Sequence, residues 1–339
     1  MEVKYMDLSI WLITQKTPIS KVTELAQKAE GNGFDAVWFA EAWRETIVPL
    51  TAIAMKTNTI KFGSGVGQIF PNNPTTLALQ GINLQELSNG RFVMGLGLST
   101  PFVVENWYGS HYGRPLRQMR ESIEVIQGIQ ASESGNRFSY DGELFKIKKY
   151  KSPVKMENPF PVYMAAIGPK MLQLAGEIAD GLVIGALHSP RYLEENVFPN
   201  LKIGAERSGR DLTNLQMIYG QICSISHNKK EAYDRARKSI MYTAQYPHYQ
   251  RVMQQEGFSE EVKVINQAIE QRDYEKAANL ITDKMVEHFT ITGEPDECRE
   301  KLQKYQDYPG MPMLTLIPFR VSEDEVIQNM ELILETFKK

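Results

Sequence analysis

Residues 60–98 combine a strand, a helix and a second strand in immediate succession, and both strands run into glycine. The first strand, Ile60–Phe62, is followed by Gly63-Ser64-Gly65-Val66-Gly67, and the second, Phe92–Leu96, is followed by Gly97. Asn73-Pro74 opens the helix between them, which ends at Leu87. In a parallel α/β sheet, ligands bind at the carboxyl ends of the strands, and glycine allows a backbone to bend sharply or to approach a ligand closely. The segment therefore predicts a ligand site, and a tight turn without a ligand is the alternative.

The rest of the chain repeats this alternation. The predicted strands are Tyr5–Ile13, Ala36–Phe39, Ile60–Phe62, Phe92–Leu96, Pro161–Ala166, Leu182–Ile184, Leu215–Ile225 and Met313–Ile317. A helix is predicted after Thr17-Pro18, with a hydroxyl cap at its start, and another after Ser322, with a capping box over Ser322-Glu323-Asp324-Glu325. Further helices are predicted over 46–56, 73–87, 114–131, 170–178 and 190–208, with a hairpin at 137–150. Eight strands alternating with helices favour a (β/α)8 TIM-type barrel of the α/β class. A doubly wound sheet is less favoured because no GxGxxG follows the first strand, which leads into Thr14-Gln15-Lys16-Thr17.

Residues 229–306 are mostly helical and are too long for one crossover between strands. We expect them to hold a helical insertion late in the chain. Residues 1–339 are then a single barrel domain that carries this insertion.

Charge and cysteine content exclude several classes of partner. The net charge is −3, and no basic run is interleaved with aromatic residues, so nucleic acid is not an expected partner. Cys223 and Cys298 lack metal-ligand spacing and favour a reducing compartment.

No apolar run reaches 18 residues, and residues 1–7 lack a basic region followed by an apolar core. We therefore expect no membrane segment and a cytoplasmic location.

The residues just past the strand ends are mostly small, with tryptophan nearby. These stretches are Ala40-Glu41-Ala42-Trp43-Arg44, Gly65-Val66-Gly67-Gln68, Gly97-Leu98-Ser99-Thr100, Ala166-Ile167-Gly168-Pro169-Lys170 and Gly185-Ala186-Leu187-His188. This composition favours a flat, largely apolar cofactor and not a metal, because the five histidines show no HxH or HExxH spacing. No GxSxG nucleophile motif occurs, and Cys223 lies inside an apolar strand. Glu41 could serve the site, or it could pair with Arg44 or with a neighbouring strand end.

Gly168-Pro169-Lys170-Met171 lies between a strand and a helix. Free N–H groups of Lys170 and Met171, the positive end of the helix dipole and the Lys170 ammonium could together hold a phosphate. An ordinary turn between a strand and a helix is the alternative.

With these stretches in view, the chain resembles the bacterial luciferase-like monooxygenase family, which includes FMN-dependent monooxygenases and coenzyme F420-dependent reductases and dehydrogenases. The resemblance rests on Gly33-Phe34-Asp35-Ala36-Val37-Trp38, Gly65-Val66 with Pro74, Leu87-Ser88-Asn89-Gly90-Arg91-Phe92, Gly95-Leu96-Gly97, Arg120-Glu121-Ser122-Ile123-Glu124 and the run from Gly168 to Gly181. These motifs cover most of residues 1–185, whereas 186–339 match only in general layout. The block 168–181 looks most like the F420-dependent methylene-tetrahydromethanopterin reductase branch.

The resemblance implies a flavin or deazaflavin, FMN or F420, at the carboxyl end of the barrel. Its phosphate would be bound by Gly168, Pro169, Lys170 and Met171, and its ring would lie against Gly65, Val66, Gly97 and Ser99. In F420-dependent relatives the peptide that matches Gly65-Val66 is cis and backs the ring. No metal is implied.

Departures from the family pattern leave the acid–base residue unassigned. The Asp-His pair that many F420-dependent members carry after strand two is Glu41-Ala42 here, and Ser99-Thr100-Pro101 stands where some dehydrogenases use a glutamate. Glu41 and Trp43 are the remaining catalytic candidates. Trp43, Trp107 and Tyr108 are predicted to hold the substrate, and packing of Trp107 and Tyr108 under the hairpin is the alternative.

The predicted activity is thus a flavin-dependent oxidoreductase acting on a small organic substrate. It would use either reduced FMN with oxygen or hydride transfer with F420. We expect a homodimer and, for FMN, a separate flavin reductase. A non-catalytic flavin-binding or sensor barrel is the alternative of a different class.

Overall fold

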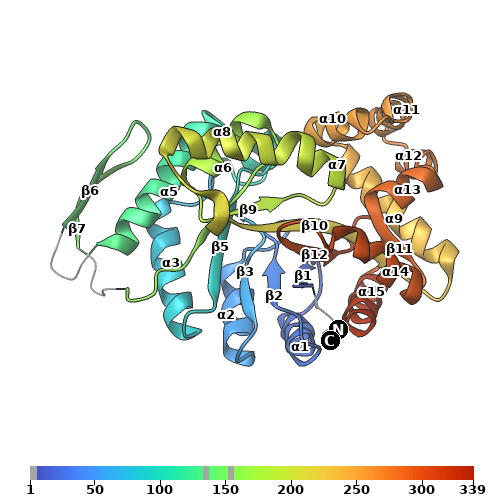
Figure 1. The fold of residues 1–339 in the computed structure, drawn as a ribbon, viewed down its shortest axis with the longest axis horizontal. Helices are drawn as coiled ribbons and strands as arrows, with labels where there is room; N and C mark the ends of the chain where they lie inside the picture. Colours follow the sequence, from blue (N-terminus) through green and yellow to red (C-terminus); the bar gives the residue numbers. More distant parts are fainter. Residues whose placement is uncertain (1–5, 133–136, 152–155) are drawn as a thin grey trace.

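The computed structural model describes residues 6–132, 137–151 and 156–339. Eight parallel strands close into a barrel, as predicted (Figure 1). In chain order they are β1 (Ser9–Leu12), β2 (Ala36–Phe39), β3 (Lys61–Ser64), β5 (Phe92–Gly97), β8 (Val162–Ala165), β9 (Gly181–Ile184), β10 (Gln216–Ile225) and β12 (Met311–Thr315). The barrel closes where β12 pairs with β1 in the register Ser9↔Met313, and the Ser9 hydroxyl donates to the Pro312 carbonyl at 2.9 Å.

Two strands were not predicted. β4 (Gly67–Gln68) pairs with β5 beyond the point where β3 leaves it, and β11 (Thr290–Gly293) pairs with the second half of β10. β11 lies in the segment predicted to be mostly helical. β10 is ten residues long, so its second half extends past the barrel and provides an edge on which β11 can pair.

Helices surround the barrel at the predicted places, except for a short helix, Pro101–Asn106, which was not predicted. They are α1 (Ile19–Gly31), α2 (Ile47–Lys56), α3 (Pro74–Leu87), α4 (Pro101–Asn106), α5 (Pro115–Ala131), α6 (Pro169–Ile178), α7 (Pro190–Tyr192), α8 (Phe198–Ser208) and α15 (Glu323–Thr336). The helix predicted over 190–208 is confirmed in its extent, because α7, a π-helical segment at Leu193–Val197 and α8 follow one another without a break. Pro199, which has no N–H to donate into the preceding turn, directly follows Phe198 at the start of α8.

Helix starts follow the sequence where a polar cap is available. The Asn73 side chain accepts a hydrogen bond from the Thr75 amide at 2.9 Å, and Ser322 forms a capping box with Glu325. The hydroxyl cap predicted for α1 is wrong, because the Thr17 hydroxyl donates to Glu323 at the start of α15 and Pro18 occupies the N-cap. This bond therefore ties the starts of the first and last helices together.

The barrel interior is filled by alternate side chains of its strands. Ala36, Trp38, Val93, Tyr163, Val183, Ile218 and Met313 form this cluster, with the Trp38 and Tyr163 rings 6.0 Å apart. Trp11, Val66 and Ala165 pack against the cluster and also line a cavity at the carboxyl ends of the strands. The packed interior thus forms the floor of that cavity.

The segment between β10 and β12 carries most of the remaining helices. It contains α9 (Lys229–Ala244), α10 (Pro247–Gln255), α11 (Ser259–Glu270), α12 (Tyr274–Asn279), α13 (Asp283–Phe289) and α14 (Pro295–Leu302). Apolar side chains of α9 to α13 share a buried cluster with residues that follow the strands, including Ile13, Ala40, Leu187 and Ile317. Figure 1 shows α10 to α13 gathered to one side of the barrel. These helices therefore cover part of the carboxyl-end face.

The predicted hairpin is present as β6 (Arg137–Asp141) and β7 (Lys146–Lys151), and it stands outside the barrel next to α5 (Figure 1). The buried Glu121 carboxylate of α5 accepts hydrogen bonds from the amides of Glu143, Leu144 and Phe145 at 2.9–3.1 Å. These bonds satisfy the turn of the hairpin and lower the pKa of Glu121, against the opposing effect of its burial. Among the described residues, no helix has the length and apolar character needed to cross a membrane.

Candidate functional site at the carboxyl end of the barrel

A cavity of about 320 Å³ opens at the carboxyl ends of the strands. Its lining residues come from the ends of five barrel strands, from the start of α6, from the loop before α5 and from α10. They are Trp11, Gly65, Val66, Gly97, Leu98, Ser99, Tyr112, Ala165, Ala166, Ile167, Gly168, Met171, Val183, Gly185, His248 and Tyr249. The volume lies at the lower end of the range of about 300–1,000 Å³ typical of small-molecule sites.

The two glycine-rich strand ends of the sequence meet in this cavity. The Gly65–Val66 peptide is cis, as the family resemblance implied, and the Glu41 amide donates to the Val66 carbonyl at 3.2 Å. A Cβ on Gly97 would lie 2.4 Å from Cγ2 of Val66, so only glycine lets β5 pass this close to the turn. Ser99 follows in a left-handed conformation with φ 61°. Four residues predicted to bind the cofactor ring thus lie together.

The predicted phosphate-binding turn lies at another part of the same rim. Gly168 is the N-cap of α6, and a Cβ placed on it would have no atom within 4 Å, so its backbone is open. Gly168 and Met171 line the cavity, whereas Pro169 and Lys170 are exposed and do not. Of the two amides predicted to be free, that of Met171 donates to the Gly168 carbonyl at 3.0 Å, because the first turn of α6 is tight.

Glu41 lies behind the cis peptide and does not line the cavity. One carboxylate oxygen accepts the Gln68 amide at 2.7 Å, and the other accepts the Tyr108 hydroxyl at 3.1 Å. Burial raises the pKa of Glu41, although these hydrogen bonds oppose the rise. Burial and the nearby Glu41 carboxylate together raise the pKa of Tyr108 to about 12. Arg44 is not among the described groups that interact with the Glu41 carboxylate, so the predicted ion pair between them is not formed.

The aromatic residues predicted to hold the substrate are spread out. Trp43 is half-buried and packs against Tyr242 of α9, with the rings 6.2 Å apart. Trp107 is 54% exposed and Tyr108 is 39% exposed. None of the three lines the cavity, and the hydroxyl of Tyr108 bonds to Glu41.

The cavity residues that were not singled out from the sequence are Trp11, Tyr112, Ala165, Val183, His248 and Tyr249. His248 and Tyr249 begin α10, so the long segment after β10 brings an imidazole to the cavity although Ala42 removed the one expected after β2. Burial, assisted by the charge of Arg251, lowers the pKa of His248. A signal was present in the sequence, because Tyr246-Pro247-His248-Tyr249 places three aromatic rings within four residues. So many aromatic rings are unusual at the start of a solvent-exposed helix.

The lining fits a flat, largely uncharged ring. None of the described residues that line the cavity is a carboxylate, lysine or arginine, and backbone or apolar atoms form most of its wall. The indole N–H of Trp11 is buried without a hydrogen-bond partner in the described part of the chain. A buried donor left unpaired is costly, which suits a site that is completed by a ligand.

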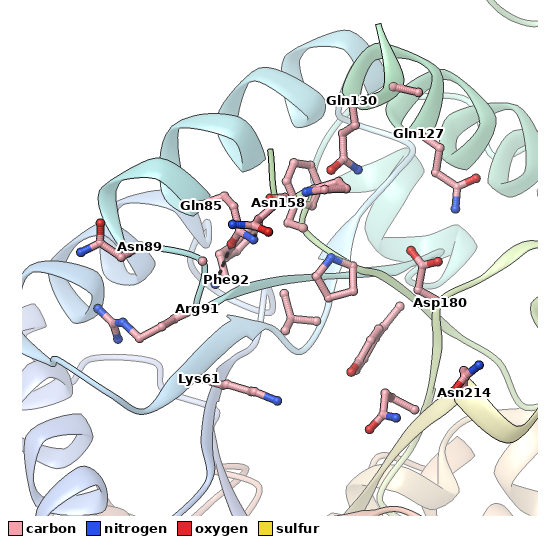
Figure 2. Close-up of a pocket in the computed structure, with 18 residues that line it drawn as sticks. Lys61, Gln85, Asn89, Arg91, Phe92, Gln127, Gln130, Asn158, Asp180 and Asn214 are labelled. Atoms are coloured by element: carbon pink, nitrogen blue, oxygen red, sulfur yellow. Dashed lines mark hydrogen bonds between the residues drawn. The ribbon is translucent and has the colours of Figure 1, made fainter. Parts of the chain in front are cut away.

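A larger cavity, of about 780 Å³, lies at the opposite end of the barrel (Figure 2). Its lining includes Lys61, Phe92 and Gln216, which are the first residues of β3, β5 and β10. The Arg91 guanidinium at its edge donates all five of its N–H groups to Ala54, Thr57, Ile60 and Ser88. Barrel enzymes place their chemistry at the carboxyl end, where the smaller cavity and the glycine-rich turns lie. We therefore assign the functional site to the smaller cavity.

Comparison with known proteins agrees with this geometry. Residues 6–310 match the family described as luciferase-like monooxygenase. The chain belongs to this family. It is 31% identical over 316 residues to a 5,10-methylenetetrahydromethanopterin reductase of Methanolobus tindarius, a match that covers 92% of this chain and 94% of the relative.

Solved structures of low sequence identity share the fold. The coenzyme F420-dependent tetrahydromethanopterin reductase of Methanopyrus kandleri superposes with a TM-score of 0.80 at 23% identity, covering 98% of each chain. The oxygenating constituent of the 3,6-diketocamphane monooxygenase of Pseudomonas putida, solved with FMN, has a TM-score of 0.68 at 15% identity and the same coverage. The protein is accordingly an oxidoreductase of the flavin type that uses F420 or FMN, as the sequence predicted.

Proposed function

We propose that this luciferase-like protein is an F420-dependent reductase that transfers a hydride to a neutral nitrogen heterocycle of the reduced-pterin type. The observation that carries this proposal is the 31% identity to a methylenetetrahydromethanopterin reductase over 92% of the chain. The cavity supports it, because its described lining holds no fixed charge that would suit an ionic substrate. The FMN-containing relative is more distant in both fold and sequence.

Residues from two parts of the cavity rim would hold the cofactor. Gly65, Val66, Gly97 and Ser99 would back the ring from the β3 and β5 side, and Gly168 to Met171 would bind the phosphate. A bound deazaflavin supplies or accepts a hydride at a ring carbon. The exposed Lys170 side chain lies one residue from Met171 and can add its charge to a phosphate outside the cavity mouth.

Glu41 acts in this proposal as a positioning residue. Its backbone N–H binds the Val66 carbonyl and its carboxylate binds the Gln68 amide, so Glu41 holds the turn that follows the cis Gly65–Val66 peptide. Trp43 supports the substrate side indirectly, through its packing against α9. Trp107 and Tyr108, which follow α4, would limit the access of water to the substrate without lining the cavity.

Titration of the purified protein with F420 and with FMN tests the cofactor assignment. We expect saturable binding of F420 and anaerobic loss of reduced F420 when a methylene-tetrahydropterin is added. Exclusive binding of FMN with oxygen-dependent turnover would replace the proposal by a monooxygenase served by a separate flavin reductase. Tight binding without turnover under either condition would favour the non-catalytic alternative.

We further propose that the protein is a cytoplasmic homodimer and that each chain is one domain with an insertion at 229–306. Val48 and Met55 of α2 are 57% and 70% exposed, and Leu79 and Leu87 of the neighbouring α3 are 38% and 47% exposed. Lys56 and Glu86 are the only formally charged residues of these two helices. An apolar face of this kind is typical of an interface. Light scattering should give twice the chain mass, and M55K should shift the protein toward the monomer.

A further inference from the structure

The first turn of α10 is the only part of the segment between β10 and β12 that lines the cavity, within the described residues. It contributes His248 and Tyr249, which lie at the first helical turn after Pro247. The His248 ring is 4.5 Å from that of Tyr249 and stacks on that of Tyr246 at 5.9 Å with an angle of 13°. These rings restrict the orientation of the imidazole.

The start of α10 is docked into the barrel through a glycine. A Cβ on Gly185 would lie 1.7 Å from the Tyr249 hydroxyl oxygen, so this oxygen occupies the space that any other residue would fill. The Gly185 carbonyl is in turn hydrogen-bonded to the Nδ1 atom of the fully buried His188, at 3.0 Å. The loop after β9 therefore forms a defined notch for Tyr249.

The far end of α10 is fixed as well. Glu256, the C-cap residue, has a side chain that is 4% exposed. It accepts from the Ser189 hydroxyl at 2.7 Å and pairs with Nε2 of His288 on α13 at 2.8 Å. Because both ends are held, His248 has a fixed place above the cavity.

His248 is the only imidazole that lines the cavity in the described part of the chain. The groups around it are the hydroxyls of Tyr112, Tyr246 and Tyr249 and the guanidinium of Arg251. Burial and Arg251 lower its pKa, and the helix N-terminus also disfavours a positive charge. At neutral pH the ring is therefore uncharged and offers one N–H donor and one nitrogen acceptor.

We propose that His248 contacts the substrate and determines its specificity, by hydrogen bonding to the ring nitrogen or amide group of a neutral heterocycle. This inference rests on the proposed function, because the cofactor ring would lie on the opposite, β3 and β5 side of the cavity. A substrate bound between that ring and α10 meets the imidazole of His248. This hydrogen bond distinguishes a neutral heterocycle from a hydrocarbon, and an uncharged imidazole offers no positive charge to a carboxylate.

Three variants of the full-length protein test this role: His248→Leu, His248→Gln and, as a matched control, His227→Leu at an exposed position between β10 and α9. With F420 and a methylene-tetrahydropterin, His248→Leu should raise KM about tenfold, as expected for one lost hydrogen bond that leaves a buried partner unpaired. His248→Gln and His227→Leu should stay within about twofold of the parent protein. F420 affinity should be unchanged in all three.

Two further measurements separate substrate contact from a structural role. Calorimetric binding of free pterin to each variant should weaken only in His248→Leu. The parent protein should lose affinity for pterin as pH falls through the lowered pKa of His248, whereas His248→Gln should not. Unchanged pterin binding and KM in a folded His248→Leu protein would overturn the inference. If the parent protein bound no F420 but its pterin affinity still depended on His248, only the proposed function would fail.

Discussion

Replacement of Gly185 by alanine would place a methyl group where the Tyr249 hydroxyl lies. The added Cβ would be 1.7 Å from the hydroxyl oxygen and 2.8 Å from Cζ, and ordinary contact begins at 3.4 Å. Tyr249 must then retreat by about 1.7 Å, which is more than a packed helix can absorb by a small adjustment. Gly185 does not have a left-handed φ, so this clash is the reason for glycine. Overpacking of this kind costs about 1–3 kcal/mol.

Tyr249→Phe in the same background relieves most of the clash. The nearest ring atom is then Cζ, at 2.8 Å, and a retreat of about 0.6 Å is sufficient. Among the described residues the Tyr249 hydroxyl makes no hydrogen bond that affects its titration, so Tyr249→Phe alone should cost under about 0.5 kcal/mol. The two substitutions should therefore couple favourably by about 1 kcal/mol, within the range measured for residues in contact.

Urea unfolding of the parent, both single variants and the double variant measures this coupling. Gly31→Ala is the matched control, since a Cβ there meets no atom within 4 Å and it should be neutral or slightly stabilising. The reasoning is refuted if the losses of the two single variants simply add, because Tyr249 would then not lie in the Gly185 notch. Loss of stability in Gly31→Ala equal to that in Gly185→Ala would refute it as well.

Three other outcomes are expected. Glu121→Gln should destabilise the protein by about 1–3 kcal/mol, because one amide oxygen cannot replace a carboxylate that accepts three N–H groups. Hydrogen exchange of the amides of residues 143–145 should become faster, and unchanged exchange would contradict this prediction. The pKa of Glu41 is raised in the folded state, so the stability of the protein should fall as pH rises from the pKa of an unfolded glutamate, about 4.3, through the folded pKa. Glu41→Gln should remove this contribution from the pH dependence of the free energy of unfolding. Lys170→Glu should weaken binding of F420 and FMN by about tenfold without a change in thermal stability, and equal affinities would reject the phosphate assignment.

The sequence was most informative where a single side chain satisfies a neighbouring backbone group, as a helix cap does. Asn73 and Ser322 predicted helix starts because a polar side chain can replace a missing backbone partner, and both caps are formed. Thr17 has the same chemistry, yet its hydroxyl bonds to Glu323, more than 300 residues away. Local propensity cannot indicate such a distant partner, so this prediction failed.

In the candidate site, too, the residues set by local pattern and topology were predicted, and those set by long-range packing were not. Gly65, Val66, Gly97 and Gly168 could be found because strand ends of a barrel converge by topology. Trp11 was not found, since the strand pattern did not show that its side chain faces the interior. His248 and Tyr249 reach the cavity only because α10 docks against Gly185, and the order of helices in 229–306 carries no information about where they pack.

The pairing of the first strand with the last, which closes the barrel, also affects how the chain folds during its synthesis. β1 finds its last neighbour only in β12, and the paired residues Ser9 and Met313 are 304 positions apart. At a synthesis rate of about 5–20 residues per second, one side of β1 waits roughly 15–60 s for that partner. During this interval the nascent sheet has two open edges, at β1 and at its newest strand, and each could pair with another chain. A ribosome-bound chaperone that shields the β1 edge should therefore raise the yield of this protein more than one that acts after release.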